Sequence, residues 1–164
     1  QFSIGLFEEM YGGVGFEYLR NNSESNFAWG LEVFNVRKRD YDLNFDFKDY
    51  TNTTSHINFY YENENIFPFS LHVSFGEYLA GDKGFTIDVS RRFKNGVSMG
   101  VFATRTDVSK ELFGEGSFDK GLYFSFPITK NLVNYEWRPL TKDPGAKLIR
   151  KNNLYDLTRK YKFN

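Results

Sequence analysis

The chain has 164 residues, which suits one domain, and its 21 basic and 21 acidic residues give a formal net charge of zero. This balance excludes the basic surface that nucleic-acid-binding proteins carry, and the absence of cysteine excludes disulfides and thiolate metal sites. No run of about 18 apolar residues occurs, so the sequence predicts no transmembrane helix.

Apolar side chains alternate with polar or small ones along most of the chain, which is the period of a β-strand. The alternation is longest from Phe67, whose parity Leu71, Val73 and Phe75 share. Asn95-Gly96 is typical of a tight hairpin turn. The pattern predicts no amphipathic helix and ten strands, at residues 2–6, 14–18, 27–33, 57–61, 67–79, 85–93, 97–103, 122–128, 133–137 and 155–163.

The links between the predicted strands alternate in length. Three of them, around residues 39–53, 107–117 and 139–152, are long, whereas those around 21–26, 63–66, 94–96 and 129–131 are fairly short. Membrane barrels have long outer loops and short periplasmic turns. We therefore predict an all-β fold, an antiparallel up-and-down transmembrane β-barrel of about ten strands, with residues 1–164 as a single barrel domain.

The two faces of the predicted strands differ in side-chain size. One carries Phe or Trp in nearly every strand, and the other carries glycine, alanine and serine, which suit the crowded inside of a narrow barrel. Aromatic residues make up 20% of the chain, yet its mean hydropathy is −0.54. Polar lumen residues offset lipid-facing apolar ones in such an average. We predict an apolar outside and a polar inside; a soluble lipocalin-like barrel, with the faces reversed, is the alternative.

Charged side chains on the small-residue face require partners, because an isolated buried charge is strongly destabilising. We therefore predict a polar network inside the lumen, formed by Glu17, Glu32, His56, His72, Asp88, Arg92, Glu136 and Arg138. The two histidines raise the possibility of a metal site or a catalytic base. No Ser/His/Asp constellation, P-loop or HExxH motif accompanies them, so we expect hydrogen-bonded histidines, no catalytic residue, no metal and no cofactor.

The long link at residues 107–117 runs into the segment 113–121, where charged side chains stand beside glycines. Glu115, Asp119 and Lys120 form a candidate contact for a ligand or partner at the barrel rim. The alternative, which we favour, is a loop folded over the barrel mouth, with the glycines meeting backbone demands.

Several stretches resemble a known family when taken together and in order. They are GLFEEMYGGVG at 5–15, RDYD at 39–42, YLAGD at 78–82, SRRFKNG at 90–96, FGEGSFDKG at 113–121, WRPLTKDPGA at 137–146 and LYDLT at 154–158. These stretches resemble the C-terminal part of the YjbH/GfcD family of exopolysaccharide- and capsule-associated outer-membrane proteins. The resemblance covers essentially the whole chain.

The resemblance implies that the chain is the last barrel of a longer, multi-barrel protein in the outer membrane of a Gram-negative bacterium. It implies a part in exopolysaccharide or capsule production or secretion. Since a lumen of about ten strands is normally filled by side chains, we expect an anchor or assembly component rather than a wide pore. The expected partners are outer-membrane lipid and other polysaccharide-secretion proteins or other domains of its own chain, with no nucleic acid. An outer-membrane enzyme acting on lipid or glycan is a further alternative, although the resemblance brings no known catalytic residue.

Overall fold

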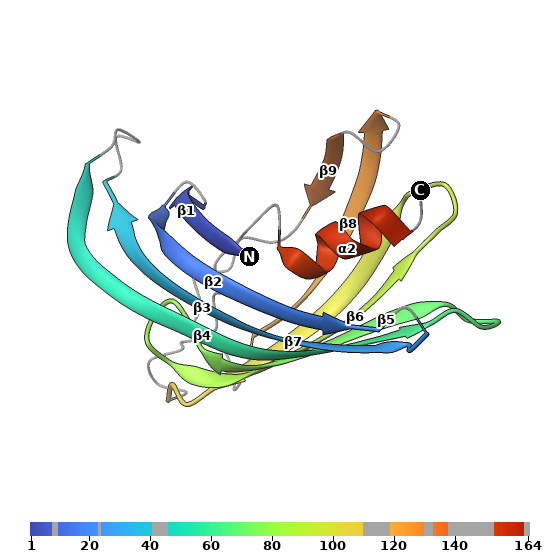
Figure 1. Ribbon diagram of the computed structural model, residues 1–164, viewed down its shortest axis with the longest axis horizontal. Coiled ribbons are helices and arrows are strands. Elements are labelled where there is room, and N and C mark those ends of the chain that lie inside the picture. The colour runs from blue at the N-terminus through green and yellow to red at the C-terminus, as the bar shows by residue number, and fades with distance from the viewer. Residues whose placement is uncertain are drawn as a thin grey trace.

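The computed structural model of the chain describes residues 1–7, 10–22, 24–40, 46–109, 119–129, 133–137 and 153–162, and for residues 127–129, 133–137 and 159–162 it describes the backbone alone. Within these residues nine strands form one antiparallel sheet, and each strand pairs with the next in sequence (Figure 1). The elements are β1 (Phe2–Leu6), β2 (Tyr11–Asn21), β3 (Phe27–Arg39), β4 (Phe47–Asn63), β5 (Phe69–Glu77), β6 (Lys83–Arg92), β7 (Ser98–Thr106), β8 (Asp119–Thr129), β9 (Val133–Trp137) and α2 (Leu154–Lys162).

The first nine predicted strands are confirmed, with somewhat different ends, and so is the all-β, up-and-down arrangement. The tenth predicted strand is wrong, because Leu154–Lys162 form the helix α2. The apolar side chains of this segment satisfy a helical spacing as well as an alternating one, since Leu157 and Tyr161 are four residues apart. No helix in the described part of the chain is long and apolar enough to span a membrane.

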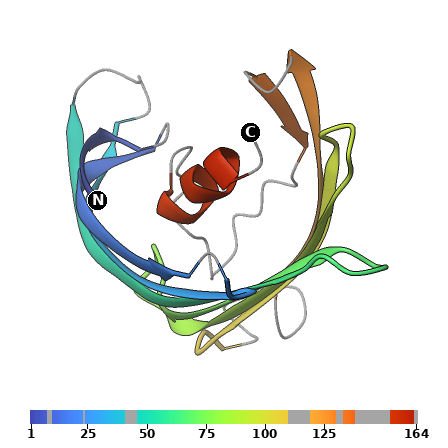
Figure 2. The ribbon, with the colours of Figure 1, turned by 45° about the vertical axis from the view of Figure 1, so that its right-hand side comes forward.

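The sheet curves into a deep trough, and α2 lies on its concave side (Figures 1 and 2). The strands β1 and β9 are the two edges of the sheet, and in the described residues they do not pair with each other. The nine strands therefore form an open, barrel-like wall, and the predicted closed barrel of ten strands is not formed by them alone.

Successive antiparallel strands place their links at alternate ends of the sheet. The ends of β1, β3, β5 and β7 and the starts of β2, β4, β6 and β8 lie at one end of the sheet, here called the loop end. The ends of β2, β4, β6 and β8 and the starts of β3, β5, β7 and β9 lie at the other, the turn end. The predicted turn at Asn95-Gly96 is confirmed: Gly96 has a φ of +85°, and its N–H donates to the Phe93 carbonyl at 2.9 Å.

The link between β5 and β6 folds inward and fills the trough at the loop end. Leu79 packs with Phe34 and Val36 in a small buried cluster. Tyr78 is fully buried, and its hydroxyl forms a 2.6 Å hydrogen bond with the Thr86 hydroxyl. Burial raises the pKa of the Tyr78 hydroxyl, so this group keeps its proton at neutral pH. Side chains of this link therefore cover part of the concave face at the loop end.

Aromatic rings on the concave face lie over glycines of the neighbouring strand. Three such pairs face each other in the sheet register: Gly15 and Phe34, Gly100 and Tyr123, and Gly121 and Phe102. A Cβ atom added to any of the three glycines would come within 3 Å of its partner's ring. The prediction that small residues belong to the crowded inner face is explained by these ring-over-glycine pairs.

The substitution Gly15→Ala is expected to destabilise the folded chain by about 1–3 kcal/mol, because a new Cβ would overlap the Phe34 ring. Phe34 is 1% exposed and cannot move aside into solvent. Denaturant unfolding of the parent, Gly15→Ala, Phe34→Leu and the double variant would give the coupling. We expect the double variant to lose less stability than the sum of the two single ones, and strict additivity would contradict the ring-over-glycine contact.

Candidate functional site

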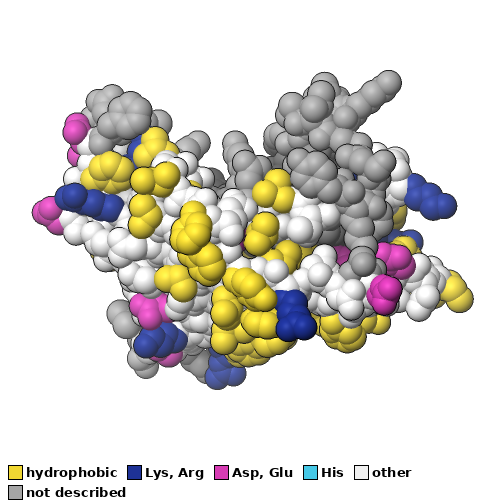
Figure 3. Space-filling view, viewed as in Figure 1, with side chains coloured by type: hydrophobic (Ala, Val, Ile, Leu, Met, Phe, Trp, Pro, Cys, Tyr) yellow, Lys and Arg dark blue, Asp and Glu magenta, His cyan; other side chains and the backbone are white. Residues whose placement is uncertain are grey.

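The concave face of the sheet is polar and its convex face is apolar. Successive side chains of a strand point to opposite faces, so each parity of a strand occupies one face. The buried polar side chains of the concave face include Glu17, Thr54, His56, Asn58, Ser70, Ser74, Thr104, Asp119 and Ser125. Exposed large hydrophobic side chains cover the convex face, among them Phe16, Trp29, Leu31, Ile57, Phe59, Phe75, Phe85, Ile87, Val89, Val101 and Leu122. Figure 3 shows patches of these hydrophobic side chains along the convex side.

Three residues of the predicted network lie side by side in the middle of the concave face. Glu17 is opposite Glu32 in the register, and Glu32 is opposite His56. His56 Nδ1 lies 3.2 Å from Glu32 Oε1, with 1% of the histidine side chain and 15% of the glutamate side chain exposed. This contact becomes an ion pair when His56 is protonated.

His72 and Asp88 lie opposite each other on β5 and β6, farther along the concave face. His72 Nε2 is 2.9 Å from Asn58 Oδ1, and the His72 ring stacks on Tyr60 with centroids 4.5 Å apart. Asp88 accepts a 2.9 Å hydrogen bond from the Tyr123 hydroxyl. The polar contacts therefore run through Asn58, Tyr60 and Tyr123, which sequence reasoning did not single out.

The three remaining residues of the predicted network are Arg92, Glu136 and Arg138. Arg92 ends β6 and is exposed, so it lies outside the buried network. Glu136 is opposite Ser125 in the register, which puts both residues on the same face of the sheet. Arg138 lies outside the described residues.

The predicted loop contact of Glu115, Asp119 and Lys120 needs a correction, because Asp119 and Lys120 begin β8 and are not loop residues. As consecutive strand residues they point to opposite faces. Asp119 is buried opposite Thr104 on the concave face, whereas Lys120 is exposed on the convex face. Glu115 lies outside the described residues.

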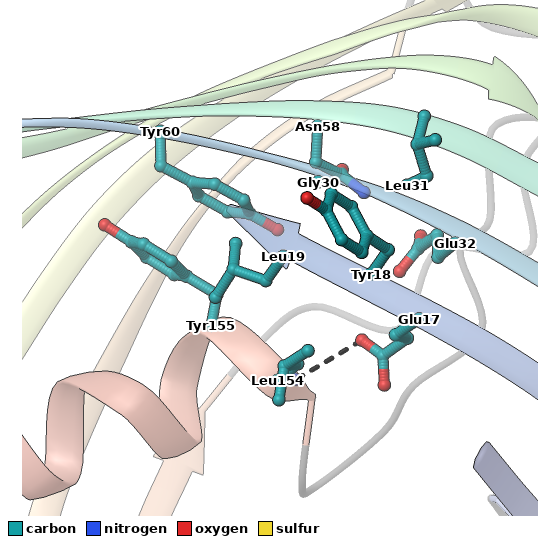
Figure 4. Close-up of a pocket in the computed structure, with 10 residues that line it drawn as sticks. All are labelled: Glu17, Tyr18, Leu19, Gly30, Leu31, Glu32, Asn58, Tyr60, Leu154 and Tyr155. Carbon is teal, nitrogen blue, oxygen red and sulfur yellow. Dashed lines mark hydrogen bonds between the residues drawn. The ribbon is translucent and has the colours of Figure 1, made fainter. Parts of the chain in front are cut away.

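Helix α2 is held on the concave face by aromatic and polar contacts (Figure 4). The Tyr155 ring stacks on Tyr60, with centroids 3.7 Å apart and planes 11° from parallel. The Tyr155 hydroxyl donates to Glu62 Oε1 at 2.5 Å. At the start of the helix, the Leu154 N–H donates to Glu17 Oε1 at 3.3 Å. Because the first N–H groups of a helix lack partners within it, the Glu17 carboxylate stabilises this terminus.

Local chemistry explains why α2 begins at Leu154. The Asn153 side chain accepts a 2.9 Å hydrogen bond from the Asp156 N–H, and the Asp156 side chain accepts one of 2.5 Å from Asn153 Nδ2. The first bond caps one of the free N–H groups at the helix start, and the second holds the Asn153 side chain in place for it. The Glu62 carboxylate that binds Tyr155 is itself positioned by a 2.8 Å hydrogen bond from the Ser70 hydroxyl.

Three stacked rings therefore join α2 to the sheet: Tyr155 on α2, Tyr60 on β4 and His72 on β5. Carboxylate and amide oxygens flank the stack, and a small polar gap remains between α2 and strands β2, β3 and β4 (Figure 4). Such a surface binds polar groups through hydrogen bonds and rings through stacking. Within the described residues, no group of three or more His, Cys, Asp or Glu side chains is placed to hold a metal ion.

Residues 1–160 match the model of the YjbH family, described as "Exopolysaccharide biosynthesis protein YbjH". The chain belongs to the YjbH family. It is also 42% identical, over 94% of its length, to a protein of Escherichia coli (strain K12) named "Uncharacterized lipoprotein YjbH". The chain spans about a quarter of that relative, 24% of its length. No solved structure matches the chain.

The residues that hold α2 in this YjbH-family chain left only weak signals in the sequence. Asn153 and Asp156 have the spacing of a helix N-terminus, a signal that could have identified α2. Tyr60 and Glu62 share the inward parity of His56, so the alternation could have added them to the network. The hydrogen bond between Tyr155 and Glu62 joins residues 93 positions apart and has no local signal.

Proposed function

We propose that this chain forms part of the membrane-spanning wall of an outer-membrane β-barrel that takes part in exopolysaccharide production or secretion. The observation that carries the proposal is the polarity of the two faces of the sheet. Large hydrophobic side chains are exposed on the convex side, and polar ones are buried on the concave side. A soluble barrel has its apolar side chains inside, so the same observation argues against the lipocalin-like alternative. The description of the YjbH family supports the link to exopolysaccharide.

The convex side chains form a continuous belt from strand to strand. One row of the register joins Trp29, Phe59, Val73, Ile87 and Ala103 across β3 to β7. The parallel row on the turn-end side is also apolar, with Phe27, Tyr61, Leu71, Val89, Val101 and Leu122, and the row on the loop-end side joins Leu31, Ile57, Phe75 and Phe85 to Arg105. Charged side chains bound this apolar belt, with Arg37, Lys83, Arg105 and Lys120 at the loop end and Arg20 and Arg91 at the turn end. An apolar band bounded by polar rims is what a bilayer requires of a barrel wall.

The open edges of the sheet, at β1 and β9, require pairing partners if the sheet spans a membrane. Inside a bilayer, the unpaired N–H and C=O groups of β1 and β9 would have no water to bind, and membrane barrels avoid this by closing. Further strands, from another domain of its own chain or from another protein of the secretion machinery, therefore complete the barrel in the proposed state. These strands and outer-membrane lipid are the proposed partners.

We propose an anchoring or assembly role rather than a wide pore or an enzyme. Tyr78 and Leu79 fill the trough at the loop end, and α2 covers its middle, which leaves little room for a polymer. The enzymatic alternative rests on Glu115 and Asp119, and the buried position of Asp119 on β8 argues against it. The name of the E. coli relative, a lipoprotein, supports a location in the envelope.

Fractionation of a Gram-negative host that carries the full-length protein would test the membrane part of this proposal. We expect the protein in the outer-membrane fraction, extracted by detergent and migrating differently on gels before and after heating. A strain without the gene is expected to lose secreted exopolysaccharide, and the restored gene is expected to recover it. A full-length protein that stays soluble and monomeric without detergent would overturn the membrane-spanning wall, and unchanged exopolysaccharide would overturn the biological role.

A further inference from the structure

The tip of the hairpin between β6 and β7 concentrates positive charge. Arg91, Arg92 and Lys94 surround Phe93, and all four side chains are exposed. The Arg91 guanidinium lies 5.1 Å from the centre of the Phe93 ring. Within the described residues, none of the three cations forms an ion pair with an acidic side chain. The hairpin tip therefore presents three cations and one aromatic ring to its surroundings.

The cations at the loop end are arranged differently. Three of them form ion pairs: Arg37 with Asp49 at 3.6 Å, Lys48 with Asp40 at 3.6 Å, and Lys83 with Glu77 at 3.8 Å. The charges of these three cations are balanced by acidic residues of the same chain. At the β6–β7 tip no such acidic partner is present among the described residues.

The position of the tip indicates what surrounds its cations. Val89, Arg91 and Phe93 follow one another on the convex parity of β6, so the apolar belt ends in a cation and a ring. Arg91 is opposite Met99, which is also exposed on the convex face. The same order occurs on β2, where Arg20 follows the convex Tyr18 and lies opposite Trp29.

A second feature of the turn end fits the same surroundings. Ile66 and Phe67, on the link between β4 and β5, have 89% and 73% of their surfaces exposed. This link neighbours the β6–β7 tip, because β5 and β6 are adjacent strands. Apolar side chains beside cations are typical of the boundary between acyl chains and headgroups.

We infer that the β6–β7 tip, with Arg91 and Lys94 as its main donors, binds the phosphate of an anionic glycerophospholipid at the membrane surface. This inference rests on the proposed membrane-spanning wall. The guanidinium of Arg91 donates two parallel hydrogen bonds to a phosphate, and the Lys94 ammonium adds a point charge. Phe93 lies at the headgroup level, where aromatic rings are favoured. Short turns of such barrels face the periplasm, and the periplasmic leaflet of the outer membrane consists of glycerophospholipids.

The test uses the full-length protein in a neutral detergent and follows its thermal unfolding midpoint as lipid is added, which yields an apparent dissociation constant. The probes are phosphatidylglycerol, phosphatidylcholine, lipid A and inorganic phosphate. The double variant Arg91→Gln/Lys94→Gln removes two cations of the tip. The matched control Lys83→Gln/Arg105→Gln removes two exposed cations at the loop end.

We expect phosphatidylglycerol to raise the midpoint of the parent protein more than phosphatidylcholine does. The tip variant is expected to bind phosphatidylglycerol roughly 30-fold more weakly, since each basic residue at a membrane surface contributes about a fivefold factor. The control variant is expected to bind within about threefold of the parent.

Equal effects of both double variants would overturn the assignment to the tip. Stronger binding of lipid A, or equal stabilisation by inorganic phosphate, would overturn the choice of a glycerophospholipid. Both variants are expected to remain in the outer-membrane fraction. Loss of the parent protein from that fraction would instead count against the proposed membrane-spanning wall, so the two failures are distinguishable.

Discussion

Replacing Ile87 with arginine is expected to prevent most of the protein from assembling in the membrane. Ile87 lies in the middle row of the apolar belt, between Val73 and Ala103, and is 40% exposed on the convex face. At the midplane of a bilayer an outward-facing arginine destabilises a barrel by about 2–4 kcal/mol. That range corresponds to a roughly 30- to 1000-fold change in the folding equilibrium. Denaturant unfolding of the full-length protein in lipid vesicles would measure the change.

The matched control places the same side chain on the same face but beyond the belt. Thr51 is exposed on β4, opposite Arg37, near the loop end. The substitution Thr51→Arg is expected to change stability by less than about 1 kcal/mol, mainly through repulsion from Arg37. If both arginines had equal effects in vesicles, or if Ile87→Arg were neutral there, the convex face would not be in contact with lipid.

The strands could be predicted from the sequence because their signal is local. In β6, for instance, Phe85, Ile87 and Val89 alternate with Thr86 and Asp88, and both burial and pairing follow this alternation. Each face of the sheet also follows from parity, which is why the polar and apolar surfaces were separated correctly. The closure of the sheet has no such signal, because it depends on which strands meet at β1 and β9.

Helix α2 was missed because its apolar residues fit two periods. Tyr155 and Leu157 alternate, yet Leu157 and Tyr161 also have helical spacing. The capping pair of Asn153 and Asp156 decides between these readings, and the alternation of side chains alone does not include it. The concave face provides the tertiary half of the explanation, since Glu17 accepts a hydrogen bond from the first turn of the helix.

The polar network could be predicted only as a set of inward-facing residues. Its contacts depend on strand register, which turns Glu32 toward His56 and brings His72 to Asn58. A shift of register by two residues would keep every side chain on its face and change every partner. The tyrosines of the network, such as Tyr60, carried no charge to draw attention, although their hydroxyl groups and rings make several of its contacts.

The substitution Tyr155→Ala is expected to release α2 from the concave face. It removes the ring stacked on Tyr60, a contact that contributes about 0.5–1.5 kcal/mol beyond burial, and the hydrogen bond to the Glu62 carboxylate, which contributes about 1.5–3 kcal/mol. A loss of roughly 2–4 kcal/mol would raise the open population of the helix about 30- to 1000-fold. Hydrogen exchange of the α2 amides in the full-length protein, followed by mass spectrometry, measures this change.

Tyr155→Phe separates the two contributions, because phenylalanine keeps the stack on Tyr60 and loses only the hydroxyl that binds Glu62. We expect its exchange to fall between the parent and the alanine variant. Exchange in Tyr155→Ala that matched the parent would show that other contacts hold α2 in the trough. If the phenylalanine and alanine variants exchanged equally fast, the contribution of Tyr155 would come from its hydrogen bond to Glu62 alone, and its ring stack on Tyr60 would contribute nothing to holding α2 on the concave face.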